Sequence, residues 1–431
     1  MTSTTINLPA EILEQILKDV LQPSFPECAS PATAAEVEHL NQRKLKERIR
    51  SITEMRLVCR KWADFLYQRH LFDELLIKSS YRAKDIMKEL AHRSAAGQPL
   101  PECRYLKVHQ LWTWLEPGMS WPRAKTQFSN LDSLLEQFSE TIVALDIRVL
   151  NFFTLPMATV ERIGRLPNLR FLRLGIDFDR RGTKTFKGVS YSEDSIPNDL
   201  PTDSKCLAYL LRAARRVVSL DLTNFRPVCS PGSLQRILGA YQFPELKMLK
   251  VDLEESQNAN QFGIVILATR LPNLKVLWIG GAGHQEGCIL HPLFQVLRRQ
   301  LEEIFFNDER LMGHITDLRF PKLRVLRLHD WGYLLRRPMM AQAPLEVLAL
   351  HCFPFHKSGH HLLSVPFRAL PHLRRLEFHE AKTFPPPSRY QESCKEYGVE
   401  CVLPHQDDVD EYGRLIINFD TSSVLQNQFR I

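Results

Sequence analysis

Histidines come closest to a chemical site in this chain. His329, His351 and His379 each follow a short apolar stretch of the form Leu-x-Leu or Leu-x-Phe. Neighbouring strands lie about 4.8 Å apart, so three such histidines would form a ladder able to ligate a metal or to sense pH. A second group consists of His356, His360 and His361. Neither group has a carboxylate or thiol companion at motif spacing, so we expect ordinary histidines and no bound metal.

A glycine-rich turn is the other candidate for chemistry. Gly280-Gly281-Ala282-Gly283 follows an apolar stretch, as a phosphate-binding loop would. Glu286 stands where the last glycine of Gly-x-Gly-x-x-Gly is needed, so we read these residues as the turn of one repeat. No Gly-x-Ser-x-Gly, Walker pattern or nucleophile–base set is present. We therefore expect no cofactor and no enzymatic activity.

A repeated pattern, Leu-x-x-Leu-x-Leu after Leu-Pro or Phe-Pro, organises most of the chain. Its clearest copies occupy residues 166–174 and 271–279. The centres, mostly 22–29 residues apart with two longer intervals of 39 and 48, are Leu106, Leu145, Leu172, Leu220, Leu249, Leu277, Ile304, Leu326, Leu348 and Leu376.

The repeat predicts strand–helix units. Leu-x-Leu alternation gives a strand with one buried face, and residues 234–241 and 293–297 have helical spacing. Where a proline precedes the strand, as it usually does, it ends the preceding helix. Such units cannot bury their own apolar face, so they stack into a curved solenoid. The chain resembles irregular leucine-rich repeats without their asparagine ladder, although an ordinary α/β domain could use similar stretches.

The residues between the core leucines predict a binding face on the concave side of the solenoid. This outward column is Lys107, Asp146, Arg173, Asp221, Lys250, Trp278, Phe305, Arg327, Ala349 and Glu377. Adjacent Trp278 and Phe305 beside Arg327 have the composition of an interaction hot spot, although exposed strand residues could have it too. The candidate substrate contacts are Lys250, Trp278, Phe305, Arg327, His329, His351 and His379.

Two segments near the start predict a docking device. Residues 8–17 place Ile12, Leu13, Ile16 and Leu17 at helical spacing after Pro9, and residues 55–62 lead into a second apolar helix. Two or three short helices cannot bury all of this apolar surface, so a partner is expected to cover the remainder.

These two segments resemble the F-box family. Leu-Pro-x-Glu-Ile-Leu-x-x-Ile-Leu at residues 8–17 matches the start of its pattern, and Leu-Val-Cys-Arg-Lys-Trp at residues 57–62 matches the end. The resemblance implies docking on a Skp-type adaptor and, through it, on a cullin-based ubiquitin ligase. The implied adaptor contacts are Leu8, Pro9, Ile12, Leu13, Ile16, Leu17, Leu57, Val58, Cys59 and Trp62.

The chain then divides into three parts. We expect an α/β protein with an N-terminal helical F-box module at residues 1–80, a leucine-rich-repeat-like solenoid at 81–403 and a tail at 404–431. Residues 22–51 interrupt the module, unlike in the compact family pattern. Their basic stretch at 43–50 suggests nuclear import or nucleic-acid binding, or simply a solvated helix face, which we favour. Residues 177–204 and the Trp-rich stretch between Val108 and Leu131 read as loops.

The composition is that of a globular protein, with 44% hydrophobic and 24% charged residues. No apolar run reaches 18 residues, and residues 1–7 lack the features of a secretion signal. Nine scattered cysteines indicate reduced thiols in the cytoplasm or nucleus. A net charge of +7 allows an acidic partner, but we expect neither nucleic acid nor a membrane.

The sequence thus predicts a substrate-recognition subunit of a Skp–cullin–F-box ubiquitin ligase that binds a protein substrate through its solenoid. The alternative is a non-catalytic repeat scaffold that acts outside any ligase.

Overall fold

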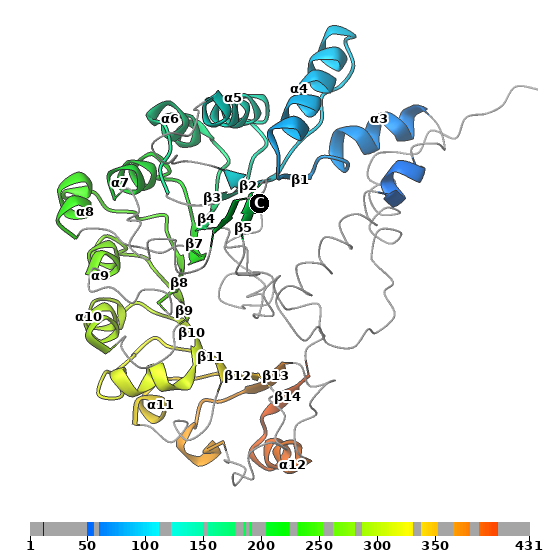
Figure 1. Cartoon of the computed structure of the whole chain (residues 1–431). Helices are drawn as coiled ribbons and strands as arrows, with labels where there is room; N and C mark the ends of the chain where they lie inside the picture. Colours follow the sequence, from blue (N-terminus) through cyan, green and yellow to red (C-terminus); the bar gives the residue numbers. More distant parts are fainter. Residues whose placement is uncertain are drawn as a thin grey trace, which may run out of the picture.

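The chain forms a curved array of strand–helix units, with the strands along the inner side of an arc and the helices outside it (Figure 1). The computed structural model describes residues 12, 50–55, 60–111, 122–149, 153–176, 184–186, 189–191, 204–224, 231–253, 262–280, 287–330, 338–351, 365–379 and 388–403. The predicted α/β solenoid is therefore confirmed. None of the helices in these ranges is long and apolar enough to span a membrane.

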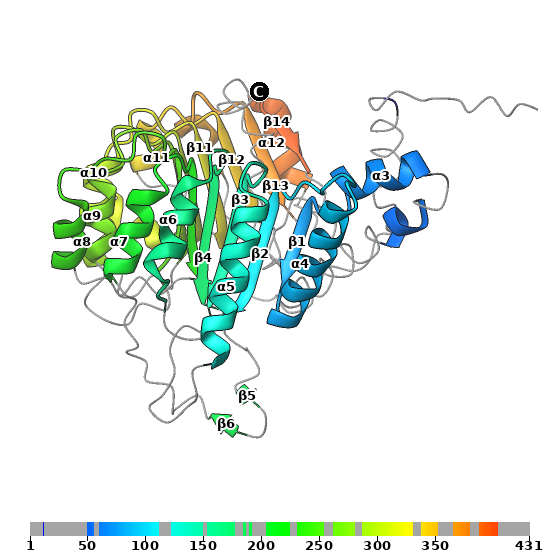
Figure 2. The ribbon, with the colours of Figure 1, turned by 90° about the horizontal axis from the view of Figure 1, so that it is seen from above.

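In the part of the chain that the structure describes, twelve parallel strands form one sheet in chain order. Figure 2 shows this sheet from above. They are β1 (Glu74–Ile77), β2 (Tyr105–Leu111), β3 (Ala144–Val149), β4 (Phe171–Ile176), β7 (Ser219–Asn224), β8 (Met248–Asp252), β9 (Val276–Gly280), β10 (Glu303–Asp308), β11 (Val325–Asp330), β12 (Val347–His351), β13 (Arg375–His379) and β14 (Glu400–Val402).

Helices connect the strands on the convex side. They are α4 (Ser80–Ala95), α5 (Pro122–Gln137), α6 (Met157–Arg165), α7 (Ser204–Ala213), α8 (Pro231–Leu238), α9 (Phe262–Ala268), α10 (Gly287–Leu297), the 3₁₀ helix η2 (Glu309–Ile315), α11 (Pro338–Gln342), the 3₁₀ helix η4 (Phe367–Ala369) and α12 (Ser388–Tyr397). Gly239 and Gly398 directly follow α8 and α12 with positive φ, the conformation that ends a helix at least cost for glycine.

The predicted core leucines line up across the sheet. All ten predicted centres lie in one register row, and that row extends to Leu75 on β1 and Cys401 on β14. Most of this row is buried against the helices in a single cluster. Because β1 starts at Glu74, the sheet begins before residue 81, where the sequence placed its boundary.

The turns that lead into the strands carry a hydrogen-bonded ladder of their own. The side-chain amides of Asn168, Asn273 and Gln300 donate to the carbonyls of Glu140, Pro244 and Leu271 in the preceding turn, at 2.7, 2.9 and 2.7 Å. Arg216 Nη1 makes the same kind of bond to the Pro167 carbonyl at 3.2 Å. These bonds satisfy turn carbonyls and tie successive repeats together.

The two long intervals contain more regular structure than the sequence suggested. In the first, α5 begins at Pro122, so the expected loop is helical from that residue. In the second, β5 (Lys184–Phe186) and β6 (Val189–Tyr191) form an antiparallel pair that stands apart from the sheet (Figure 2). Trp112, Trp114 and Trp121 lie outside the described residues.

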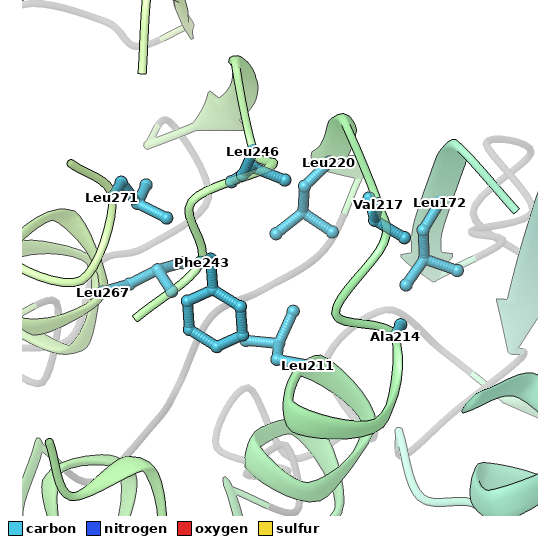
Figure 3. Close-up of a pocket in the computed structure, with 9 residues that line it drawn as sticks. All are labelled: Leu172, Leu211, Ala214, Val217, Leu220, Phe243, Leu246, Leu267 and Leu271. Atoms are coloured by element: carbon cyan, nitrogen blue, oxygen red, sulfur yellow. The ribbon is translucent and has the colours of Figure 1, made fainter. Parts of the chain in front are cut away.

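The second long interval also coincides with a gap in the core. Leu172, Leu211, Ala214, Val217, Leu220, Phe243, Leu246, Leu267 and Leu271 surround it (Figure 3). All nine side chains are apolar, and most of them belong to α7 and to the turns that lead into β7, β8 and β9, so the gap is not a polar site.

Candidate binding face

The residues of the predicted outward column form one row across the sheet. Lys107, Asp146, Arg173, Asp221, Lys250, Trp278, Phe305, Arg327, Ala349 and Glu377 are successive register partners from β2 to β13. Because alternate residues of a strand face opposite sides, this row lies on the concave face. Its first five members alternate in charge from strand to strand.

Asp146 is the centre of the first half of the row. It accepts a hydrogen bond from His109 Nε2 at 3.3 Å and bonds from Arg148 Nε and Nη2 at 3.3 and 3.1 Å, and Arg173 Nη1 lies 3.9 Å away. Burial by itself raises the pKa of Asp146, but the His109 hydrogen bond and the charges of Arg173 and Arg148 outweigh it. The pKa therefore lies well below its usual value. Asp146 is an ionised, fully engaged carboxylate.

Asp221 continues this network on β7. Arg173 Nε lies 3.5 Å from one of its oxygens, and the other accepts bonds from the Thr223 backbone N–H at 3.0 Å and hydroxyl at 2.7 Å. Burial again opposes ionisation, but Arg173, Lys250 and Thr223 lower the pKa of Asp221. Both acids of this half are thus held as anions beside cations.

A hollow lies over these strands. It has a volume of about 620 Å³, part of which is open to solvent. It is lined by Tyr105, Leu106, Lys107, Ala144, Leu145, Asp146, Phe171, Leu172, Arg173, Ser219, Asp221 and Lys250. Lys107 is held by Glu74 at 2.9 Å. The hollow therefore offers charged and aromatic side chains at fixed positions, and it includes Lys250, one of the predicted substrate contacts.

The aromatic pair differs from the sequence expectation. Trp278 and Phe305 do stack, with ring centroids 5.0 Å apart and planes 8° from parallel. However, Trp278 is only 2% exposed and Phe305 0%, and they form a buried cluster with Met248 and Val276. The prediction that they stand outward as a hot spot is wrong in this respect. Their stacking and their apolar neighbours hold them inside the protein.

Arg327 is likewise engaged within the chain. Its Nε donates to Glu303 Oε1 at 2.8 Å and its Nη1 to Glu377 Oε2 at 2.9 Å. Burial lowers the pKa of Arg327, but the two carboxylates outweigh it and the pKa is raised. Arg327 is 7% exposed. The register confirms the predicted position of Arg327 beside the aromatic pair. Its burial contradicts the prediction that it is a surface contact.

Glu303 is the residue of this half that sequence reasoning missed. It lies two residues before Phe305 on the same face of β10, and it is 3% exposed. A carboxylate at that position is a diagonal neighbour of Arg327 on the next strand. This spacing could have predicted the ion pair from the sequence.

The histidine ladder is seen only in its backbone. His351 on β12 pairs in register with His379 on β13, and His329 lies on the neighbouring β11. The side chains of all three fall outside the described residues, as do His356, His360 and His361. In the described ranges, no three His, Cys, Asp or Glu side chains gather closely enough to hold a metal ion.

Most predicted adaptor contacts also lie outside the described residues. These are Leu8, Pro9, Leu13, Ile16, Leu17, Leu57, Val58 and Cys59. Ile12 is helical and 46% exposed. Trp62 lies in α3 (Arg60–Arg69), where it packs against a small cluster built on Ile52 and Leu66. This cluster is separate from the solenoid core.

One side chain joins this helical part to the solenoid. The guanidinium of Arg93 on α4 lies 3.6 Å from the centroid of the Tyr67 ring on α3, and its Nη2 lies 3.8 Å from Asp64. Backbone bonds run alongside, from Glu102 N to Gln68 O at 2.7 Å and from Arg104 N to Asp73 O at 3.0 Å. The orientation of α3 against the first repeat is thereby fixed.

Comparison with known proteins gives distant likenesses. No family model and no curated protein matches the chain. It is similar to the leucine-rich repeat-containing protein LegL7 from Legionella pneumophila, at 15% identity over 73% of this chain and 95% of that one, with a TM-score of 0.40. A second likeness is to a fucosyltransferase mutant of the alpha-L-fucosidase AlfC, at 12% identity over 84% and 81%, with a TM-score of 0.18. Neither similarity is close enough to argue from.

Proposed function

We propose that this chain is the substrate-recognition subunit of a Skp–cullin–F-box ubiquitin ligase. The observation that carries the proposal is the pair of matched segments at residues 8–17 and 57–62, which resemble both ends of the F-box pattern in the right order. The N-terminal helices would dock on a Skp-type adaptor, and a cullin would be reached through that adaptor.

The packing of α3 supports a separate docking module. Ile52 and Leu66 are buried in their own cluster with Met55, Trp62, Phe65 and Leu71, whereas Phe72 packs on the solenoid core. A small helical module with its own core, followed at once by a solenoid, suits a device that docks at one end and captures at the other.

The solenoid would hold a protein substrate on its concave face. Among the predicted contacts, Trp278, Phe305 and Arg327 are buried, so the exposed part of the face favours the hollow around Lys107, Arg173 and Lys250. We place the substrate contact there. Catalysis would belong to the ligase partners, and this chain would contribute proximity.

Substitution of the docking helix tests the proposal. Leu13→Asp should abolish co-purification with a Skp-type adaptor, because a carboxylate would enter an apolar interface. Met157→Asp, on a residue of α6 that is 47% exposed, is the matched control and should leave adaptor binding unchanged. Unchanged binding of the Leu13→Asp protein, measured while its unfolding midpoint equals that of the control, would refute docking through this helix.

The alternative scaffold function is favoured by the interruption at residues 22–51, which departs from the compact family module. In that case the adaptor, if bound, would not bring a cullin. Reconstitution with purified adaptor and cullin separates the two functions. A ternary complex supports the ligase, and an adaptor complex that excludes cullin supports the scaffold.

A further inference from the structure

One edge of the solenoid collects the segments through which the chain enters each strand. From β4 to β13 these run from the last turn of a helix to the residue before the next strand: 162–170, 210–218, 235–247, 265–275, 294–302, 312–324, 339–346 and 365–374. Backbone bonds connect them in series, for example Lys275 N to Lys247 O at 2.8 Å and Arg324 N to Glu302 O at 2.8 Å. We call this edge the strand-entry rim.

The strand-entry rim carries the net charge of the chain. Its eight segments hold seventeen Lys and Arg against four Asp and Glu, which gives +13, whereas the whole chain carries +7. The rest of the chain is therefore net negative, by +7 minus +13, or −6. Fourteen of the seventeen cations are arginines. Such asymmetry creates a local positive potential.

Fold stability explains only part of this charge. Cations in the last turn of a helix, such as Arg162 and Arg212, are favoured by the helix dipole. Lys275 and Arg324 form ion pairs with Glu302 and Glu346 at 2.9 and 2.6 Å. Beyond the helix ends, further cations are exposed to solvent and form no ion pair with the residues that the structure describes: Arg215, Arg299, Arg319 and Lys322.

The exposed side chains and the curvature of the rim indicate which class of partner it could bind. None of its Phe, Tyr or Trp side chains is exposed, and Phe243, Phe320 and Phe367 are buried. Stacking on single-stranded nucleic acid needs exposed rings. Insertion into a membrane surface needs a group of exposed apolar side chains, and among the described rim residues Val296 is the one large apolar side chain that is exposed. The rim also follows an arc (Figure 1), which a stiff duplex cannot track without being bent. An extended acidic peptide can follow it, and arginine binds carboxylates in a two-pronged manner.

We propose that the strand-entry rim binds an acidic, carboxylate-rich segment of a partner protein. This site is separate from the concave face and from the N-terminal docking helices, so it can be occupied together with either. It goes beyond the proposed ligase function and does not depend on it.

Titration with a labelled peptide of alternating Glu and Ser tests the proposal, using fluorescence anisotropy of the full chain at several salt concentrations. The rim variant combines Arg299→Glu, Arg319→Glu and Lys322→Glu. The control combines Arg82→Glu, Lys84→Glu and Lys88→Glu on exposed residues of α4, with the same change in net charge. We expect the rim variant to bind at least about tenfold more weakly and with a shallower salt dependence, and the control to bind nearly as the native chain does.

Three outcomes would overturn the proposal. Equal weakening in both variants would mean that net charge alone attracts the peptide. Undiminished binding by the rim variant would place the site elsewhere. Tighter binding of the native chain to duplex DNA or to anionic vesicles than to the peptide would identify a different class of partner. If the triple variant unfolds, the double variant Arg299→Gln with Lys322→Gln replaces it, and a smaller loss of peptide affinity is expected.

Discussion

At the scale of single residues, Arg327 shows what the concave face is built to do. Its two carboxylate partners lie on opposite sides of its own strand, β11. Glu303 is on the adjacent β10, and Glu377 is on β13, two strands away in the other direction. Arg327→Met should lower the free energy of unfolding by about 3–5 kcal/mol, since it removes the guanidinium bonded to both buried carboxylates. Glu377 would keep Arg375, at 3.6 Å. Urea unfolding measures this loss.

The matched control for that experiment is Arg374→Met, on an exposed side chain one residue before β13. Its effect should stay within about 0.5 kcal/mol, as is usual for surface substitutions. If the two variants lose equal stability, Arg327 is not the structural cation that its contacts indicate.

Asp146 makes the stability of the chain depend on pH. Its pKa is lower in the folded state than the value of about 3.9 expected in the unfolded chain. The ionised carboxylate therefore stabilises the fold fully above that value, and the contribution fades as the pH falls below it towards the folded pKa. Asp146→Asn should cost about 3 kcal/mol at pH 7, because Arg148 loses the carboxylate that accepts its two bonds, while Arg173 keeps Asp221. The gap to the native chain should narrow in acid.

Urea midpoints at neutral pH and at steps below pH 5 check this prediction. Asp85→Asn, on an exposed carboxylate of α4, is the control, and its difference from the native chain should stay small at every pH. A gap for Asp146→Asn that stays constant into acid would contradict a lowered pKa.

These residues also show where sequence reasoning stops. The place of Trp278, Phe305 and Arg327 in one row follows from strand alternation, and the register confirms it. Their burial does not follow from alternation, because it depends on what packs over the sheet and on partners such as Glu303. That residue lies on the strand next to Arg327, two positions before its register partner Phe305. A pattern of period two predicts the face of a side chain but not its exposure.

At the scale of elements, the sequence predicted the repeats from β2 to β13. The centres from Leu106 to Leu376 were found because leucine or isoleucine fills each of them. The first strand was missed, because Glu74–Ile77 directly follows a helix of the N-terminal part and was counted with it. The last strand, Glu400–Val402, is short and has Cys401 in the core row.

The strand-entry turns explain how irregular repeats remain in register. The asparagine ladder expected of regular repeats is absent from the sequence, yet Asn168, Asn273 and Gln300 bond to the preceding turn from the other end of the strand. Beside the longest interval between repeats lies the small apolar gap lined by Leu172 and Leu220 (Figure 3). These turn hydrogen bonds can therefore form between repeats of different length.

At the scale of the whole molecule, two apolar cores are held in one orientation. The helical part has its own cluster around Ile52 and Leu66, and the solenoid has a continuous core from Leu75 onwards. Arg93 on Tyr67 and the backbone bonds of Gln68 and Asp73 connect them. A fixed joint would hold any captured protein at a set distance and angle from the docking end.

Arg93→Met tests this joint. Loss of the cation–π contact should weaken it by about 1–2 kcal/mol, which corresponds to roughly 5–30-fold faster local opening. Hydrogen exchange should therefore speed up for the amides of α3 and remain unchanged for β9 to β11, since the solenoid core does not depend on Arg93. Arg82→Met, exposed on the same helix, should change neither. Equal acceleration in α3 and in β9 to β11 would mean that the two cores open as one unit, and the joint would then be part of a single cooperative fold.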